Sequence, residues 1–207
     1  TSRAAHWPAR IEVKPLSPPP PPAAGITVTW IGHATFLLRT PHGNFLTDPV
    51  FSERASPVTW AGPRRLRAPG IGFADLPRID AVLLSHDHYD HCDAPTLRRL
   101  AREHDPLVLA PLGHAELLRS FGVKRAMDLD WWQAHPWAPG VKITLTPARH
   151  WCRRTIGGTN HRLWGGFGLR TPAATLYFAG DTGFDAGLFA EIGRRLGPPD
   201  LALLPIG

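Results

Sequence analysis

One short apolar run constrains the fold of this chain more than any other feature. Residues 81–84, Ala-Val-Leu-Leu, are followed directly by Ser-His-Asp-His-Tyr-Asp-His at residues 85–91. A continuous apolar run of this length predicts a strand that is buried on both faces of a sheet. In α/β folds, ligands bind outside the carboxyl ends of such strands, because the scaffold there is rigid and the following loop can turn inward. The sequence therefore predicts a functional loop at residues 85–91.

The rest of the chain alternates predicted strands with predicted helices. Further strands are predicted at residues 26–31, 35–39, 45–48, 107–110, 142–146, 163–170, 175–179 and 201–206, and helices at about residues 94–104, 113–120 and 185–196. Asp93 followed by Ala94 and Pro95 is typical of a helix N-cap with proline in the first turn. The last strand is predicted to be apolar and buried. Strands interleaved with helices around a mixed sheet indicate an α/β (α+β) layered domain.

Two segments are predicted to lack regular structure. Residues 15–25 contain five consecutive prolines, which favour an extended polyproline conformation. We therefore divide the chain into a Pro-rich tail at residues 1–25 and one domain at residues 26–207. Residues 49–78 contain several prolines and glycines, so they predict a long irregular loop of a kind that is usually functional or mobile.

The composition is that of an ordinary globular protein. The chain has 207 residues, of which 43% are hydrophobic and 19% charged, and this length allows one domain with a sizeable core. No apolar run approaches the roughly 20 residues that span a bilayer, and no hydrophobic signal core is evident. Cys92 and Cys152 are predicted to be free thiols, because two cysteines cannot make a disulfide framework. We therefore expect a cytoplasmic or peripheral membrane protein. The prevalence of Arg, Ala, Gly and Pro over Lys is typical of a GC-rich bacterium.

The basic residues are almost all arginines. The formal net charge is +6, from 23 basic and 17 acidic residues, and lysine occurs only at positions 14, 124 and 142. Arginine suits bidentate contacts to phosphate or carboxylate, so the charge favours a substrate with an anionic group. The alternative is that an excess this small serves solubility alone. No nucleic-acid partner is predicted.

The polar cluster at residues 85–91 has the chemistry of a metal site. Imidazole and carboxylate groups are the ligands that hold zinc or a similar divalent ion. Because residues two apart in extended backbone point to the same side, His86 and His88 can bind one ion together. Asp90 and His91 lie past the turn, where they can reach a neighbouring ion. The alternative is a solvated polar loop that binds metal only adventitiously.

The motif His-x-His-x-Asp-His after an apolar strand resembles the signature of the metallo-β-lactamase superfamily. The resemblance implies a four-layer αββα sandwich with two metals in a cleft at one edge. Asp48 matches an early aspartate that supports the histidine loop without binding metal. His150 matches the family's lone later histidine, and Asp181 matches its aspartate in a Gly-Asp-Thr-Gly turn.

Within the superfamily, the chain is most similar to the N-acylphosphatidylethanolamine-hydrolysing phospholipase D group. The similar stretches are residues 29–35, 46–49, 54–57, 129–132, 150–152 and 197–207, and the likeness extends from residue 27 to the end. It implies that His86, His88 and His150 hold one zinc, that Asp90 and His91 hold a second, and that Asp181 bridges the two ions. The family's second metal also takes a histidine from a later strand, and no residue here matches it. We therefore expect a chain truncated at its C-terminus, lacking the last strand and helices of the sandwich.

The resemblance implies a zinc-dependent hydrolase that attacks a phosphodiester with a metal-bound hydroxide, as in phospholipase D-like hydrolysis. Asp90 is the candidate catalytic residue, because it could orient the nucleophile. Candidate substrate-binding residues are His33, Arg64, Arg65, Arg153 and Arg154, where the arginines could clamp a phosphate. The alternatives for these residues are surface arginines and, for His33, a structural hydrogen bond to the neighbouring loop.

Two other functions stay open. One fold hosts many chemistries, so the same metal scaffold could hydrolyse another ester, a lactone or an amide. The chain could also be a non-catalytic or metal-deficient fragment. A redox di-iron centre is disfavoured, because relatives of that kind resemble this motif with glutamate where His88 stands. The expected partner is a small-molecule or phospholipid substrate, with peripheral contact to a membrane, and the oligomeric state is left open.

Overall fold

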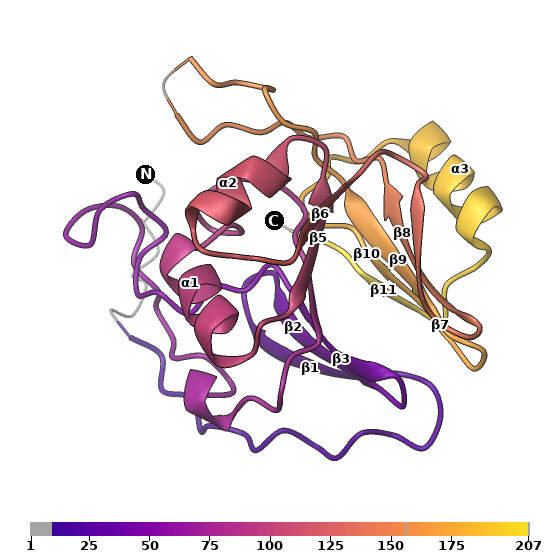
Figure 1. Ribbon diagram of the computed structural model, residues 1–207, viewed down its shortest axis with the longest axis horizontal. Helices are drawn as coiled ribbons and strands as arrows, with labels where there is room; N and C mark the ends of the chain where they lie inside the picture. The colour runs from indigo at the N-terminus through magenta and orange to yellow at the C-terminus, as the bar shows by residue number, and fades with distance from the viewer. Residues whose placement is uncertain (1–9, 156, 207) are drawn as a thin grey trace, which may run out of the picture.

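Two β-sheets stack face to face and carry helices on their outer faces (Figure 1). The computed structural model describes residues 10–155 and 157–206, so residues 1–9 of the predicted tail and residue 207 of the predicted domain lie outside the described residues. In Figure 1, the layers run from α1 and α2 at the left, through the two sheets, to α3 at the right. This is the four-layer αββα arrangement that the sequence predicts.

The first sheet has six strands in the order β1-β2-β3-β4-β5-β6. The strands are β1 (Thr27–Gly32), β2 (Thr35–Thr40), β3 (Gly43–Thr47), β4 (Ala81–Leu83), β5 (Leu107–Pro111) and β6 (Ala126–Leu129), and the accompanying helices are η1 (Phe73–Asp75), α1 (Ala94–Glu103) and α2 (His114–Ser120). The first three strands form an antiparallel meander, whereas β3 to β6 pair in parallel. β4 therefore lies inside the sheet, as its apolar sequence predicts.

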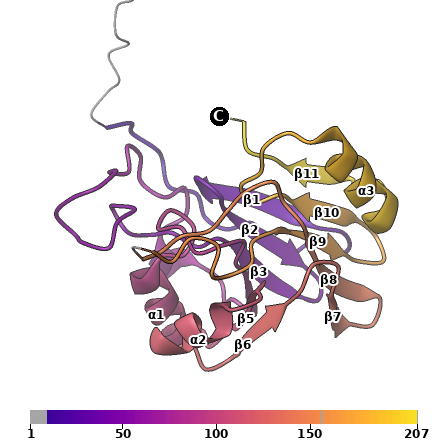
Figure 2. The ribbon, with the colours of Figure 1, turned by 90° about the horizontal axis from the view of Figure 1, so that it is seen from above.

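The second sheet has five strands in the order β11-β10-β9-β8-β7. Its elements are β7 (Ala134–Ala138), β8 (Val141–Thr146), β9 (Gly166–Arg170), β10 (Thr175–Phe178), α3 (Ala186–Leu196) and β11 (Leu201–Leu203). Strands β7 to β10 are antiparallel neighbours, and β11 pairs in parallel with β10 at the edge. Figure 2 shows the two sheets from above, with α3 beside β10 and β11.

Apolar side chains fill the spaces between the layers. Leu97 and Leu100 of α1 pack with Val82 on the outer face of the first sheet. Between the sheets, Leu83 and Phe167 belong to one buried cluster. Each fully buried leucine or phenylalanine side chain contributes about 1.5–3 kcal/mol relative to an exposed one. The first sheet is therefore packed on both faces, against α1 on one side and against the second sheet on the other. The end of β4, which carries the polar residues, is held rigidly by this packing.

The topology brings several strand ends to one edge of the sandwich. β3 and β4 are parallel, so Asp48 and the loop at residues 85–91 both follow carboxyl ends on the same edge. β1 and β3 are each antiparallel to β2, so the β1–β2 turn lies at this edge as well. In the second sheet, β8 and β10 are each antiparallel to β9, and the segments after them carry His150 and Asp181.

The predicted elements agree with the observed ones with five exceptions. The two smaller ones are that η1 lies in a segment predicted to be irregular and that the strand predicted at residues 163–170 begins only at Gly166. Strands β6 and β7 are absent from the prediction, because both are short and β7 contains a proline and a histidine. The prediction of a buried strand at residues 201–206 is wrong: β11 ends at Leu203, and Leu201 is 44% exposed. The physical reason is its position at the edge of the sheet, which an apolar run by itself does not reveal.

The two segments predicted to be irregular run along the body of the domain. The Leu16 backbone nitrogen donates a hydrogen bond to the Gly70 carbonyl over 2.7 Å, and Ile11 forms an isolated bridge with Arg67. The boundary at residue 25 stays a prediction.

No helix within the described ranges has both the length and the apolar character needed to cross a bilayer.

Candidate metal centre

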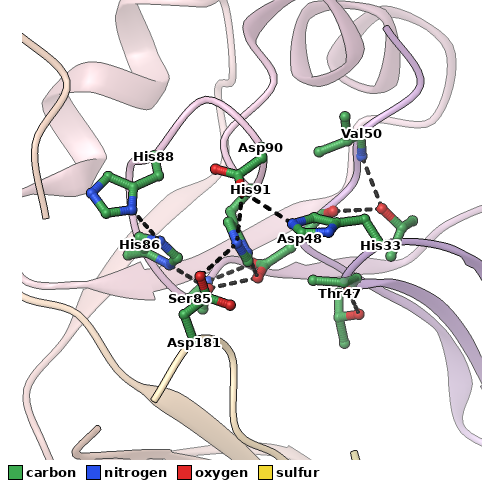
Figure 3. Close-up of polar contacts among 12 residues, drawn as sticks. His33, Thr47, Asp48, Val50, Ser85, His86, His88, Asp90, His91 and Asp181 are labelled. Carbon is green, nitrogen blue, oxygen red and sulfur yellow. Dashed lines mark hydrogen bonds and ion pairs between the residues drawn. The ribbon is translucent and has the colours of Figure 1, made fainter. Parts of the chain in front are cut away.

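A buried aspartate organises the loop that follows β4. Asp48 closes β3 with a positive φ of 32°, and its side chain is completely buried. Its Oδ1 accepts a hydrogen bond from the Ser85 backbone nitrogen at 2.7 Å, and its Oδ2 accepts one from Ser85 Oγ at 2.6 Å. The same Oδ2 lies 2.7 Å from His91 Nδ1 (Figure 3). Asp48 therefore holds both ends of the predicted metal loop, and its lone pairs are used in doing so.

Three imidazole nitrogens converge beside this loop. His86 Nε2 lies 2.9 Å from His88 Nδ1, and His150 Nε2 lies 3.3 Å from the same atom. Two nitrogens bound to one tetrahedral zinc, with bonds of about 2.0–2.1 Å, lie about 3.3 Å apart. The three histidines thus fit the ligand face of a single divalent ion. Ser85 Oγ lies 2.9 Å from His86 Nδ1 and orients that ring.

A second group of candidate ligands lies next to the first. His91 Nε2 is buried and has no hydrogen-bond partner among the described residues. It lies 3.2 Å from Asp181 Oδ2 and 3.6 Å from Asp90 Oδ2. Asp181 Oδ2 in turn lies 3.8 Å from His150 Nε2. Asp181 therefore stands between the two groups, where one carboxylate can reach an ion in each.

The charge states of the histidines differ between the two groups. Burial, as the largest cause, holds the pKa of His86, His88 and His150 below the ordinary histidine value. These three rings are neutral at pH 7 and can offer a lone pair to a metal. Burial also opposes protonation of His91, but the nearby carboxylates of Asp181 and Asp48 outweigh it and raise its pKa to about 10.

The two candidate carboxylates are ionised. Burial raises the pKa of Asp90, but the hydrogen bond from His33 and the charge of His91 bring it well below the ordinary aspartate value. Burial acts on Asp181 in the same direction, and His91 again lowers its pKa below the usual range. Both side chains therefore carry the negative charge that a divalent cation requires.

Two cavities border the centre and share His33 and Asp90. One, of about 510 Å³, is lined by apolar residues of both sheets, among them Phe36 and Phe178, and also reaches Asp181. The other, of about 340 Å³, is lined by residues of the irregular segment after β3, including Arg65. The candidate metal centre is thus open to solvent on its Asp90 side.

The four candidate phosphate-binding arginines lie in different surroundings. Arg64 is exposed and paired with Glu53, and Arg153 is exposed beside the later histidine. Arg65 donates to the Val50 and Ser52 carbonyls, with its guanidinium at the second cavity. Arg154 donates to the carbonyls of residues 87 and 92 and supports the metal loop. Their role toward a substrate stays a prediction.

Three contributors to the site are absent from the sequence prediction. Ser85 bonds both Asp48 and His86, and its place directly after the buried strand is a signal that could have identified it. Arg162 pairs with the buried Asp87 at 3.0 Å, a contact between distant segments that no local pattern reveals. Trp151 packs edge-on against His88 with ring centroids 4.4 Å apart.

Comparison with known proteins places this geometry in a family. Residues 43–207 match the family model described as a beta-lactamase superfamily domain. The chain is 38% identical over 193 residues to N-acyl-phosphatidylethanolamine-hydrolyzing phospholipase D 1 of Caenorhabditis elegans, and this match covers 89% of the chain and 54% of the worm protein. The chain thus spans about half the length of that relative.

Two further comparisons agree on the fold. The chain is 30% identical over 179 residues to a UPF0173 metal-dependent hydrolase of Caldivirga maquilingensis, a match that covers 86% of the chain and 68% of that protein. The crystal structure of CmlA, a diiron β-hydroxylase from Streptomyces venezuelae, superposes with a TM-score of 0.66 at 24% identity, covering 88% of this chain and 35% of CmlA. The chain therefore belongs to the metallo-β-lactamase superfamily of metal-dependent hydrolases.

Proposed function

We propose that this chain carries the dinuclear metal centre of a hydrolase that cleaves phosphodiester bonds. One observation carries the proposal: Asp181 Oδ2 lies 3.8 Å from His150 Nε2 and 3.2 Å from His91 Nε2. A single carboxylate oxygen within reach of both histidine groups supports two neighbouring ions, because one carboxylate so placed can serve as a shared ligand of a two-metal site.

The side chains divide the work of such a centre. His86, His88 and His150 supply neutral imidazoles for one ion, while His91 and Asp90 face the other, with Asp181 shared. When bound, two divalent ions lower the pKa of water toward neutrality and neutralise charge that develops on the attacked group. Asp90 is ionised and 43% exposed, so its carboxylate can accept a hydrogen bond from the attacking water and orient it.

Zinc is the proposed metal. Three imidazoles with a shared carboxylate form a ligand set that suits zinc, and the nitrogen spacing of 2.9–3.3 Å is compatible with tetrahedral bonds. The fold alone does not select the metal, since CmlA is a diiron protein. The argument for zinc therefore rests on the donor atoms of this chain.

A phospholipid-like phosphodiester is the proposed substrate. The worm relative is named for hydrolysing N-acyl-phosphatidylethanolamine. The cavity of about 510 Å³ offers apolar walls from Phe36 and Phe178 directly beside Asp90 and Asp181, as a lipid chain next to a charged ester group requires. Such a substrate brings the protein to the surface of a bilayer during turnover, which is the proposed membrane contact.

Metal content and turnover test the proposal together. We expect the complete protein to bind two zinc ions and to hydrolyse bis-p-nitrophenyl phosphate and N-acylphosphatidylethanolamine, with turnover that a chelator abolishes and zinc restores. His88→Ala should lose both zinc binding at the triad and turnover. The exposed His42, remote from the centre, provides the matched control His42→Ala, which should keep both. Two bound ions without any phosphodiester turnover would refute the phosphodiesterase assignment.

A second candidate is hydrolysis of a different bond on the same centre. The likeness to a UPF0173 metal-dependent hydrolase supports it, because that name specifies metal dependence and hydrolysis without a substrate. Lactone, thioester and amide substrates should therefore be assayed beside the phosphodiesters. Chelator-sensitive turnover of one of them alone would favour this candidate.

A further inference from the structure

The turn between β1 and β2 holds a histidine in a strained conformation. His33 has a φ of 50°, in the left-handed region that disfavours residues with a Cβ atom, and it follows a break in the β1–β2 register between Trp30 and Gly32. Such a conformation is energetically costly and persists only where the surroundings enforce it. The indole nitrogen of Trp30 donates a 2.8 Å hydrogen bond to the His33 carbonyl and fixes the turn.

The strained turn directs the His33 ring toward the metal loop. His33 Nε2 lies 3.1 Å from Asp90 Oδ2 (Figure 3), across 57 positions of sequence. The ring also packs against His91, with centroids 5.0 Å apart at an interplanar angle of 63°. His33 thus contacts both residues of the second candidate ligand group.

Asp90 has one side-chain hydrogen bond among the described residues, and that bond comes from His33. The His91 side chain is completely buried and bonded to Asp48, whereas the Asp90 side chain is 43% exposed. Within the described residues, His33 is the one side chain whose hydrogen bond holds the Asp90 carboxylate. The two cavities meet at this pair, so little packing replaces the bond.

We propose that His33 is a positioning residue: its Nε2–H donates to Asp90 Oδ2 and aims the carboxylate at the second metal. This inference rests on the proposed dinuclear centre and deepens it. Partners of this kind fix the orientation of metal ligands, and their loss typically weakens metal affinity or activity by about 10–100-fold. The strained turn accompanies this bond: with His33 at a φ of 50°, its imidazole reaches from the β1–β2 turn to Asp90 in the loop after β4.

Zinc titration of the complete protein tests the inference. His33→Ala should weaken the affinity for the second zinc by about 10–100-fold and leave the first unchanged. His33→Gln should recover most of the loss, because the glutamine amide can donate at nearly the same place. His42→Ala replaces an exposed histidine in the β2–β3 turn, at the opposite end of β2, and should bind both ions like the wild type.

A glycine variant separates positioning from a structural role in the turn. Glycine adopts positive φ freely, so His33→Gly should melt at or above the temperature of His33→Ala. The second zinc should nevertheless bind as weakly to His33→Gly as to His33→Ala. Recovery of zinc affinity in His33→Gly would mean that only the backbone of the turn matters, and the inference would be wrong.

The remaining outcomes distinguish this inference from the proposed function. Unchanged affinity for the second zinc in His33→Ala overturns the inference while the dinuclear centre stands. A His33→Gln variant as weak as His33→Ala also overturns it, since that result indicates direct metal ligation by imidazole. Fewer than two zinc ions in the complete wild-type protein refute the proposed centre and this inference with it.

Discussion

Asp48 Oδ2 lies 2.7 Å from His91 Nδ1, and both side chains are completely buried. The bond joins the residue that follows β3 to the loop that follows β4, and these two strands are parallel neighbours. Because Nδ1 is engaged, the metal-facing atom of His91 must be Nε2, which is buried without another hydrogen-bond partner in the described chain. One carboxylate thus selects the ligand atom of a histidine 43 residues away.

Replacing Asp48 should therefore damage both stability and metal binding. Asp48→Ala leaves the Ser85 N–H and hydroxyl and the His91 imidazole without their acceptor in a buried site. We expect the free energy of unfolding to fall by about 3–5 kcal/mol, measured by urea denaturation, because removing one partner of a buried charged pair leaves the other without compensation. Asp75→Ala, at an exposed aspartate, should change it little. Equal effects of the two substitutions would contradict this account.

Gly180 should be intolerant of any side chain. It has a φ of 61°, and an added Cβ would lie 2.7 Å from Ser85 Cβ, closer than real contacts allow. Gly180→Ala should push the Asp181 turn away from the metal loop, and so lower both the melting temperature and zinc affinity. The matched control is Gly193→Ala in α3, where the added Cβ meets nothing within 4 Å. That variant should gain about 0.4–1 kcal/mol of stability, read by thermal and urea unfolding.

His104 should make the fold sensitive to acid. Its Nδ1 accepts a 3.0 Å hydrogen bond from the Ile79 backbone nitrogen, and burial lowers its pKa below the ordinary value of 6.5. Between the folded pKa and 6.5 the unfolded chain binds more protons, so stability is full above this window and falls as pH decreases through it.

The variant His104→Asn tests this contribution, because an asparagine oxygen can accept the same bond without titrating. The free energy of unfolding, measured from about pH 7.5 down to 5, should fall less steeply in His104→Asn than in the wild type. Identical slopes would exclude His104 as a source of the pH dependence.

Both cysteines should be unreactive in the folded protein. Burial raises the pKa of Cys92 to about 12 and also raises that of Cys152, and neither residue is exposed. Since the thiolate is the reactive form, Ellman's reagent at about pH 8 should detect no fast thiol in the native chain and both thiols in guanidinium. Fast labelling of one native thiol would reveal local opening near the metal loop.

The sequence predicts the scaffold of the site well, because that scaffold depends on local pattern. The apolar run before His86 predicts a buried strand, and Asp93 with Pro95 predicts the start of α1 at Ala94. The strands that the prediction lacks, β6 and β7, carry mixed polar and apolar residues and owe their conformation to pairing with β5 and β8. Pairing of this kind overrides weak intrinsic preference.

By itself the sequence placed His86, His88, Asp90 and His91 directly after a buried strand, and its resemblance to the metallo-β-lactamase superfamily added His150 and Asp181 as candidate ligands. Only the tertiary structure decided how they are held. The bonds of His33 to Asp90, Asp48 to His91 and Arg162 to Asp87 join segments 57, 43 and 75 residues apart. They exist because strand pairing and the stacking of two sheets bring these loops to one edge, and no local pattern encodes such long-range packing.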